Sequence, residues 1–466
     1  MPEETEGAPV EMNAGSLAED LQLFLQHIDA LQASLPRTMV AVNAEAGNAR
    51  ARFLGYAEKH GTVTKRHEQT VDYTFSVPYE ARAMRLAREA ASGGVAVDLV
   101  PRVFLLALIS QFDAFLGRLL RGLFLLRPEL IASSERSLTL SQLLDLGSVE
   151  RATEFLLDKE VESVLRKSHA DQFSWMEAKF DIKLREGLTS WPCFIEITER
   201  RNLFAHADGV ISDQYLDICE RHGAELGDGC AKGDRLGVTS DYFVTAYECI
   251  LELGVKLCQV LWRKLRPDQI DDADDNLNAV TFDLLVGEKY ELACQLLDFA
   301  CTVLRKHGSE RSRLILTVNR AQAHKWSGDD EKCARLLGEQ DWSAAGTDFR
   351  LAVAVLGDRF DEAADIMKSI GPDESMPETN YQEWPVFREF RKSQQFADAF
   401  EAVFGKAFVS IETTVRDDER ERQQAALDQL REMLKDATIT DDPDDAEDDA
   451  ANRADGADDR ATAGGT

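Results

Sequence analysis

Hydrophobic residues recur at three- and four-residue spacing along most of the 466-residue chain, and this spacing predicts helices. The first apolar stripe stops before Pro36 and consists of Leu17, Leu21, Phe24, Leu25, Ile28 and Leu31. A second helix is predicted over residues 38–60, and a third over residues 79–92 that ends at a Gly-Gly pair. Residues 71–77 instead alternate between apolar and polar, which favours a short strand or extended arm.

The strongest helical periodicity follows Pro101, which is typical of the first turn of a helix. One face of this predicted helix carries Phe112, Phe115, Leu116, Leu119, Leu120 and Leu123. Asp113 lies at the edge of that stripe, where it is either a boundary residue in contact with solvent or a side chain oriented toward a site. The segment also contains Arg118 and Arg121, which a membrane span of this length would hardly tolerate. We therefore expect a buried core helix and no membrane association.

The later periodic segments complete an all-α prediction, since strand signals are rare and only 12 residues are Pro. Further helices are predicted at residues 140–146, 149–167, 174–180, 191–206 and 240–265. Pro267 and the acidic run of residues 268–278 then indicate a linker. The predicted domains are an N-terminal helical extension of residues 1–98, a helical bundle of residues 99–266 and a second helical domain of residues 279–435.

A spacing pattern repeats beyond this linker. Glycine is followed by a mostly aromatic residue at +3 and by alanine at +6 in three segments, Gly287-x-x-Tyr290-x-x-Ala293, Gly328-x-x-Glu331-x-x-Ala334 and Gly357-x-x-Phe360-x-x-Ala363. Glycine and alanine allow two helices to approach closely, and the aromatic residue fills the groove between neighbours. The pattern resembles degenerate tetratricopeptide repeats over residues 281–371. A non-repeating helical bundle is the alternative.

The sequence carries a strong negative charge, formally −31 at pH 7, which argues against a general polyanion binder. Residues 436–466 hold eleven acidic residues and two arginines, so their net charge is 2 − 11 = −9. This composition predicts a disordered acidic tail after a last charged helix at residues 407–435. A nucleic-acid site would have to be a small basic patch.

The N-terminus and the cysteines favour a cytoplasmic protein. Residues 1–16 are acidic and contain no apolar segment of the kind found in secretory signals. The eight cysteines form no CxxC pair, which favours reduced thiols rather than disulfides. Cys219 and His222 are the one close Cys-His pair and lack the second pair that a zinc site needs, so we expect neither metal nor cofactor.

The most concentrated candidate chemistry is the stretch Arg201-Asn202-Leu203-Phe204-Ala205-His206, at the end of a predicted helix. Histidine can act as a general acid or base near neutral pH, and arginine can hold a phosphate or stabilise the charge of its transition state. RNA cleavage needs these two functions when the ribose 2′-OH is the nucleophile. On a helix Asn202 and His206 share a face, whereas Arg201 lies about 140° around the axis from His206. The arginine side chain must therefore bend back toward the site.

These residues resemble the HEPN superfamily, whose ribonuclease members carry Arg, four to six residues and then His, often with Asn directly after the Arg. The earlier segment Ser110-Gln111-Phe112-Asp113 looks like the helix that supplies a further polar residue in that family. The resemblance covers roughly residues 99–265. It implies an all-α bundle that forms a homodimer and brings two motifs into one cleft.

The resemblance also implies roles for the site residues in a metal-independent reaction. His206 would be the general acid or base, Arg201 the contact for the phosphate or its transition state, Asn202 a positioning residue, and Asp113 would orient the motif. Asp208 stands where one branch of the family, which is paired with a nucleotidyltransferase antitoxin, has tyrosine. Regulation by modification at that position is therefore not expected.

Other candidate side chains are interpreted as non-catalytic. Arg200 is taken as a surface or phosphate-positioning residue. The histidines without a matching partner in the sequence are taken as structural or exposed, namely His169, His222, His307 and His324.

The leading hypothesis is an endoribonuclease of the kind found in toxins and anti-phage effectors, with RNA as substrate and a repeat domain that senses or binds a protein partner. Two alternatives stay open. One is a non-catalytic HEPN-like module that binds a nucleotide, RNA or protein, and the other is a structural scaffold. For His206 the corresponding alternative is a helix-end residue that caps or packs without chemistry.

Overall fold

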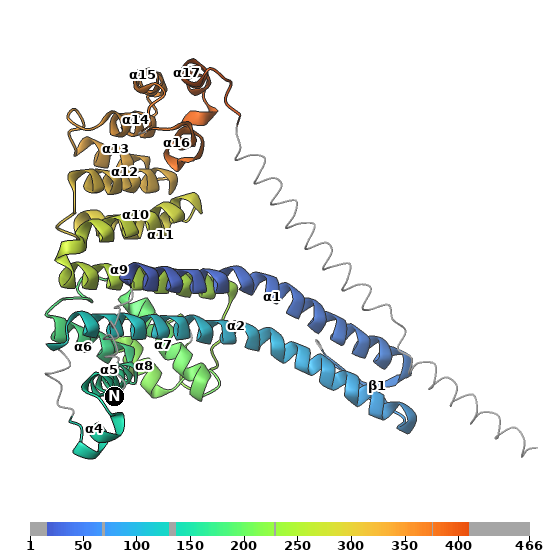
Figure 1. The fold of residues 1–466 in the computed structure, drawn as a ribbon. Helices are drawn as coiled ribbons and strands as arrows, with labels where there is room; N and C mark the ends of the chain where they lie inside the picture. Colours follow the sequence, from blue (N-terminus) through green and yellow to red (C-terminus); the bar gives the residue numbers. More distant parts are fainter. Residues whose placement is uncertain (1–15, 68–69, 130–136, 228–229, 375, 410–466) are drawn as a thin grey trace, which may run out of the picture. The chain divides into compact units, whose positions relative to one another are not determined.

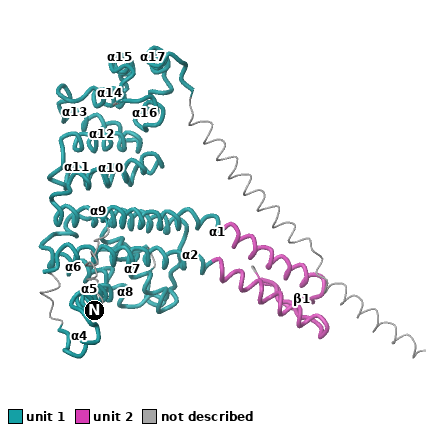
Figure 2. The backbone as a smooth tube through the Cα atoms, in the orientation of Figure 1, with its two compact units in different colours: residues 1–39, 98–409 teal, residues 40–97, 410–466 magenta. Residues whose placement is uncertain are grey.

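The computed structural model describes residues 16–67, 70–129, 137–227, 230–374 and 376–409. Within them the chain is all-α, as predicted, apart from one two-stranded hairpin. The predicted last helix at residues 407–435 lies almost entirely outside the described residues, and the acidic tail lies wholly outside them. Backbone contacts divide the chain into a first unit of residues 1–39 and 98–409 and a second unit of residues 40–97 and 410–466 (Figure 2).

Two long helices, α1 (Leu17–His60) and α2 (Val77–Leu126), flank the hairpin (Figure 1). The predicted breaks at Pro36, Gly93-Gly94 and Pro101 were wrong, because each helix continues through them. A proline removes one backbone donor, and at Pro36 and Pro101 this loss does not end the helix. At Gly93 an added Cβ would lie 2.9 Å from the Cα of Ala46, so this glycine allows close approach of α1 and α2 in the second unit.

The hairpin pairs β1 (Gly61–Arg66) with β2 (Val71–Phe75) in antiparallel register. The second strand lies where the alternating pattern predicted one, whereas its partner was not expected. Gly61 pairs with Phe75, and an irregularity between Val63 and Lys65 interrupts the register.

The first unit begins with a bundle built around α2. All six apolar residues of its predicted stripe, from Phe112 to Leu123, are fully buried. The other helices of the bundle are α4 (Leu140–Leu146), α5 (Val149–Leu165), α6 (His169–Phe180), α7 (Trp191–His206), α8 (Asp213–Arg221) and α9 (Ser240–Leu265). Helix α8 was not predicted and α6 begins five residues before its predicted start, whereas the other four lie close to their predicted positions. From α1, Phe24 stacks on Phe115 with ring centroids 4.6 Å apart, so the start of α1 completes this core.

By length and composition α2 is also the one helix in the described part of the chain that could cross a membrane. Its apolar window has a mean hydropathy of 1.8 and is 28% buried. Core helices meet the same criterion, and here the apolar stripe of α2 is covered by protein.

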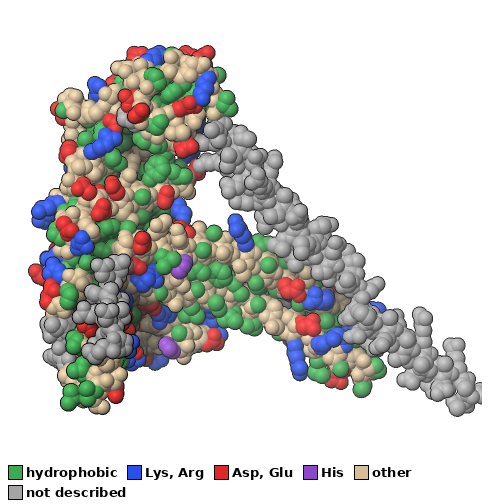
Figure 3. All heavy atoms as spheres, in the orientation of Figure 1, with side chains coloured by type: hydrophobic (Ala, Val, Ile, Leu, Met, Phe, Trp, Pro, Cys, Tyr) green, Lys and Arg blue, Asp and Glu red, His purple; other side chains and the backbone are tan. Residues whose placement is uncertain are grey.

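Consecutive helical pairs follow the bundle and stack on one another (Figure 1). They are α10 (Ile270–Val286) with α11 (Tyr290–Thr302), α12 (Glu310–Trp326) with α13 (Asp330–Gly338), and α14 (Thr347–Leu356) with α15 (Phe360–Ile370). On the face drawn in Figure 3, hydrophobic side chains lie among charged ones over this stack. We call these six helices the stack.

The turns inside the pairs correct the alignment of the middle segment. In the outer pairs the residue after the glycine, Glu288 or Asp358, has positive φ. In the middle pair Gly328 itself has positive φ. At the position of the buried alanines of the outer pairs, Ala293 and Ala363, the middle pair has the buried Cys333 rather than the exposed Ala334. The middle segment is therefore offset by one residue from the pattern read in the sequence.

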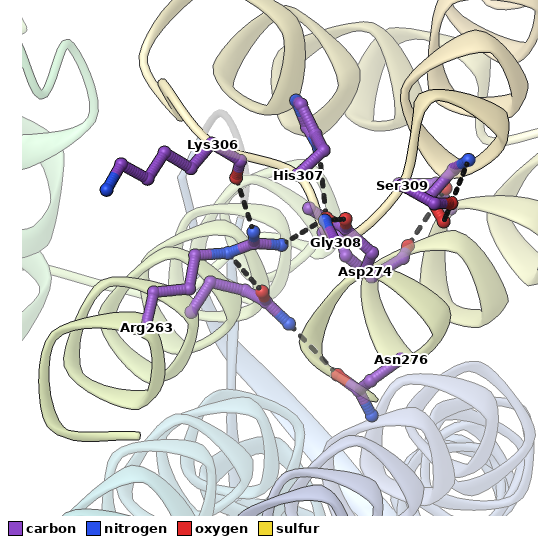
Figure 4. Close-up of polar contacts among 11 residues, drawn as sticks. Arg263, Asp274, Asn276, Lys306, His307, Gly308 and Ser309 are labelled. Carbon is purple, nitrogen blue, oxygen red and sulfur yellow. Dashed lines mark hydrogen bonds and ion pairs between the residues drawn. The ribbon is translucent and has the colours of Figure 1, made fainter. Parts of the chain in front are cut away.

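The predicted linker is helical instead. Residues 267–269 form a 3-10 turn, η1 (Pro267–Gln269), and α10 starts directly after it. Asp274 is 1% exposed, and three groups contact its carboxylate (Figure 4). Arg263 Nη2 donates to it at 2.6 Å, His307 Nδ1 lies 3.0 Å away, and the Gly308 amide donates at 2.8 Å. The acidic composition thus predicted a linker, but the segment is helical and one of its carboxylates, that of Asp274, is buried.

After the stack the chain forms short elements. They are α16 (Glu378–Glu383), the 3-10 turns η2 (Pro385–Phe387) and η3 (Phe390–Lys392), and α17 (Gln394–Phe404). Phe390, Phe396 and Phe400 are buried in a second core cluster together with residues of α12 to α15.

Candidate functional site

Helix α7 carries the Arg-Asn-x-x-x-His stretch and is embedded in the first bundle. Pro192 lies in its first turn, as is common at helix starts. Its buried residues lie on several sides of the helix and are Trp191, Phe194, Ile195, Glu196, Ile197, Thr198 and Leu203. Neighbouring helices therefore fix the orientation of the motif on its last two turns.

A buried carboxylate, Glu196, ties α7 to α8 and α9. The hydroxyls of Tyr215 and Tyr242 donate 2.6 Å hydrogen bonds to its two oxygens, and Arg200 Nε donates one of 2.7 Å. The Arg200 guanidinium lies 3.9 Å from the centroid of the Tyr242 ring and donates to the Gly237 carbonyl. Burial and the neighbouring Glu196 raise the pKa of both tyrosines, so both remain donors. Arg200 is therefore a largely buried part of the scaffold rather than a surface residue.

Asp113 on α2 contacts two cationic or ionisable side chains. Its Oδ2 lies 2.5 Å from Nη2 of Arg201, and its Oδ1 lies 2.9 Å from Nε2 of His169, the first residue of α6. A carboxylate only accepts hydrogen bonds, so Nε2 of His169 carries a proton in this contact. The exposed side-chain fractions are 29% for Asp113, 25% for Arg201 and 8% for His169. Of the two interpretations of Asp113, the geometry favours a side chain oriented toward the site.

Asn202 connects the arginine to a second carboxyl group. Its Oδ1 accepts a 3.2 Å hydrogen bond from Nη1 of Arg201, and its Nδ2 donates one of 3.4 Å to Glu199. Burial raises the pKa of Glu199 above that of an ordinary glutamate. Glu199 therefore holds its proton to higher pH than an exposed carboxyl group does.

His206 is the last residue of α7 and is exposed to solvent. The chain then turns through Asp208 and Gly209, which both have positive φ. Asp208 accepts from Arg102 at 3.3 Å and from Arg235 at 2.6 Å. Asp208 therefore anchors the end of α7.

One cavity of about 490 Å³ brings the predicted site residues together. Its lining includes all four of them, Asp113, Arg201, Asn202 and His206. Arg201 and His206 thus reach the same space although they lie on different faces of α7. Two exposed cations, Arg166 and Lys167, lie on the same lining, and Arg166 forms an ion pair with Glu162.

Sequence reasoning missed His169 and Gln172, which also line this cavity. Gln172 Nε2 donates to the carbonyls of Leu165 and Lys167, and its buried Oε1 has no hydrogen-bond partner among the described residues. A signal was present for His169, because Ser168 before it caps α6 and places the histidine at a fixed helix start. Nothing in its spacing, however, connects it to Asp113, which lies 56 residues earlier.

The other three histidines set aside in the sequence have structural partners. The pairs are His222 with Trp191 at 3.2 Å, His307 with Asp274 at 3.0 Å and His324 with Asp298 at 3.0 Å. Desolvation and the nearby Arg185 and Arg221 lower the pKa of His222.

No group of three or more His, Cys, Asp or Glu side chains in the described part of the chain is arranged to hold a metal ion. No protein-family model, curated protein or solved structure matches the chain. The residues that line this cavity, and the chemistry that they can perform, are therefore the evidence for its function.

Proposed function

We propose that this protein is a metal-independent endoribonuclease of the HEPN type. The observation that carries the proposal is the single cavity lined by Asp113, Arg201, Asn202 and His206. It combines a solvent-accessible imidazole with a guanidinium whose orientation is fixed from α2. These are the groups that an attack of the ribose 2′-OH on the adjacent phosphate requires.

In this proposal Arg201 binds the scissile phosphate. Asp113 and Asn202 engage two of its five N–H donors, which leaves three for phosphate oxygens. The ion pair with Asp113 also limits the rotamers of a long side chain, so less conformational entropy is lost when substrate binds. Arg201 thereby stabilises the extra negative charge of the transition state.

His206 transfers the protons. As a base it takes the proton of the 2′-OH while the new bond to phosphorus forms and the bond to the 5′-oxygen breaks. The departing 5′-oxygen takes up a proton, from a second His206 across a dimer or from Glu199. The products are a 2′,3′-cyclic phosphate and a 5′-hydroxyl end.

The remaining parts of the chain fit a regulated effector. The consecutive helical pairs of the stack support the resemblance to tetratricopeptide-like repeats, and we propose that the stack senses or binds a protein partner. We further propose that the enzyme acts as a homodimer in the cytoplasm, as a toxin or an anti-phage defence protein. No cofactor takes part.

The decisive experiment is incubation of the purified protein with RNA and with matched DNA in EDTA. We expect cleavage of RNA alone, with 2′,3′-cyclic phosphate ends, and a loss of at least about a hundredfold in His206→Ala, because the general acid or base is removed. Arg201→Ala should lose activity to a similar degree.

The matched control is His67→Ala, which removes an exposed histidine of the hairpin segment and should cleave like the wild type. Cleavage by His206→Ala at the wild-type rate would contradict the proposal. RNA binding without cleavage, unaffected by His206→Ala, would instead support a non-catalytic binding module.

A further inference from the structure

The stack contains a second cavity, unrelated to the first in position and chemistry. It measures about 430 Å³ and lies between α10, α12, α14 and the segment from Trp384 to Val386. Three aromatic side chains line it, Phe282, Phe349 and Trp384, together with aliphatic residues of α12. Its size and its mainly apolar walls are those of small-molecule sites.

One polar group in this cavity has no partner. Gln322 on α12 is 2% exposed, and its Nε2 atom is buried without a hydrogen bond to any described residue. Leaving such a group unpaired costs about 1–3 kcal/mol. The Nε2 donor of Gln322 is therefore available to a hydrogen-bond acceptor on a ligand.

The other polar groups on the lining narrow the class of ligand. Arg311 forms a 2.8 Å ion pair with Asp348, and Asp283 adds a further carboxyl group, so no unpaired positive charge is present to hold a phosphate. Asn319 Nδ2 donates to Asn278 Oδ1 at 2.8 Å, which engages one polar atom of each amide. The uncharged amides of Gln322, Asn319 and Asn278 therefore favour a neutral polar ligand over an anion.

We propose that this cavity binds an uncharged planar heterocycle with adjacent hydrogen-bond donor and acceptor groups, the class to which free nucleobases belong. The flat ring lies against Phe282, Phe349 and Trp384, and its polar edge pairs with both atoms of the Gln322 carboxamide. A glutamine amide forms such a two-bond pair with adenine in nucleic-acid recognition. The site is independent of the ribonuclease chemistry proposed for the first cavity.

The test is calorimetric titration of the full chain with adenine and with uracil, beside indole, a flat ring with one donor and no acceptor. We expect saturable binding of at least one of the two bases at one site per chain. Gln322→Leu should weaken that binding at least about tenfold, because a pair of hydrogen bonds is lost. The same variant should bind indole as well as the wild type does or better.

Two further variants make the result interpretable. Gln295→Leu changes an exposed glutamine of α11 outside this cavity and should leave binding unchanged. Ala279→Trp places a bulky ring on the lining from an exposed position of α10 and should abolish binding of every probe, even if Gln322→Leu folds poorly.

Three results would overturn the proposal. The first is no binding of either base, and the second is equal binding by wild type and Gln322→Leu. The third is preferential binding of N-acetylleucine amide, which carries the same amide edge on an aliphatic side chain and would assign the cavity to a peptide.

Discussion

At the scale of single residues, Asp113 organises the first cavity. It contacts Arg201 from α7 with one oxygen and His169 from α6 with the other. The carboxylate therefore fixes two side chains whose helices come from different parts of the chain. Arg201 alone, at the end of a helix, would sample several rotamers.

Replacing Asp113 by Asn tests this positioning role. The amide keeps the shape and removes the charge, so Arg201 loses its ion pair while the helices remain packed. We expect RNA cleavage to fall by about ten- to a hundredfold, mainly in kcat, as is typical of residues that orient a catalytic group. Asp145→Asn, on exposed α4, is the control. An unchanged kcat would mean that Asp113 does not position Arg201.

That the four candidate residues line one cavity could be anticipated because three of them lie within one short stretch. Arg201, Asn202 and His206 are close in sequence, and Asp113 stood out as an acid beside an apolar stripe. Glu196 and His169 could not be identified, because their roles depend on tertiary contacts with Tyr242 and Asp113. No local pattern records such contacts.

At the scale of elements, local stop signals misled most. Pro36 and Gly93-Gly94 are helix terminators by propensity, yet α1 and α2 pass through them. Propensity is a weak prior that tertiary context overrides. The same limit applies to the acidic run after Pro267. Its charge alone predicts a linker, but the run forms part of α10 and its Asp274 is buried.

The contacts of Asp274 predict a large effect of its substitution. In Asp274→Asn the guanidinium of Arg263, whose side chain is 10% exposed, loses its carboxylate. We expect a loss of about 3 kcal/mol in the free energy of unfolding at pH 7, since a buried cation is left unpaired. Urea denaturation measures this, with Asp275→Asn at the next, exposed position as control. Equal midpoints for Asp274→Asn and the wild type would contradict it.

The same carboxyl group predicts a pH dependence. Burial by itself would raise the pKa of Asp274, but hydrogen bonds from His307, Arg263 and the Gly308 amide lower it below the usual value. Its stabilising contribution is therefore present above the unfolded-state pKa of about 3.9 and is lost as pH falls through the lower folded value. The stability difference between the wild type and Asp274→Asn should shrink below about pH 4. A difference that stays constant down to pH 2 would argue against this assignment.

At the scale of the whole molecule, the fold class could be predicted from periodicity, and the all-α prediction is confirmed. The negative charge gave less information, because acidic and basic side chains are interspersed on the face drawn in Figure 3. Single-sequence patterns also did not reveal that residues 16–39 join the core of the first unit. That arrangement depends on long-range packing of Phe24 against α2.

The proposed homodimer predicts a concentration-dependent mass. Leu99 and Val103 lie four residues apart on α2 and are 49% and 50% exposed, so they offer an apolar strip for a second copy. Sedimentation should give twice the mass of the chain, and Val103→Glu should shift the protein toward the monomer and reduce RNA cleavage. Leu144→Glu, on α4, changes an even more exposed apolar residue and should have neither effect. A wild type that sediments as a monomer at all concentrations would contradict the dimer.

Helix α9 of the first bundle also packs against α10 and α11 of the stack. Leu257, Leu261 and Trp262 lie in the same hydrophobic cluster as Leu284 and Leu297 of α10 and α11. A chain cut after residue 266 would expose the apolar side of α9 that α10 and α11 cover, and the remaining bundle would become prone to aggregation. The bundle and the stack are thus not interchangeable modules. If the stack senses a partner as proposed, any recombination event that exchanged it would have had to keep α10 and α11, so diversification of the proposed sensor should be confined to the outer helices.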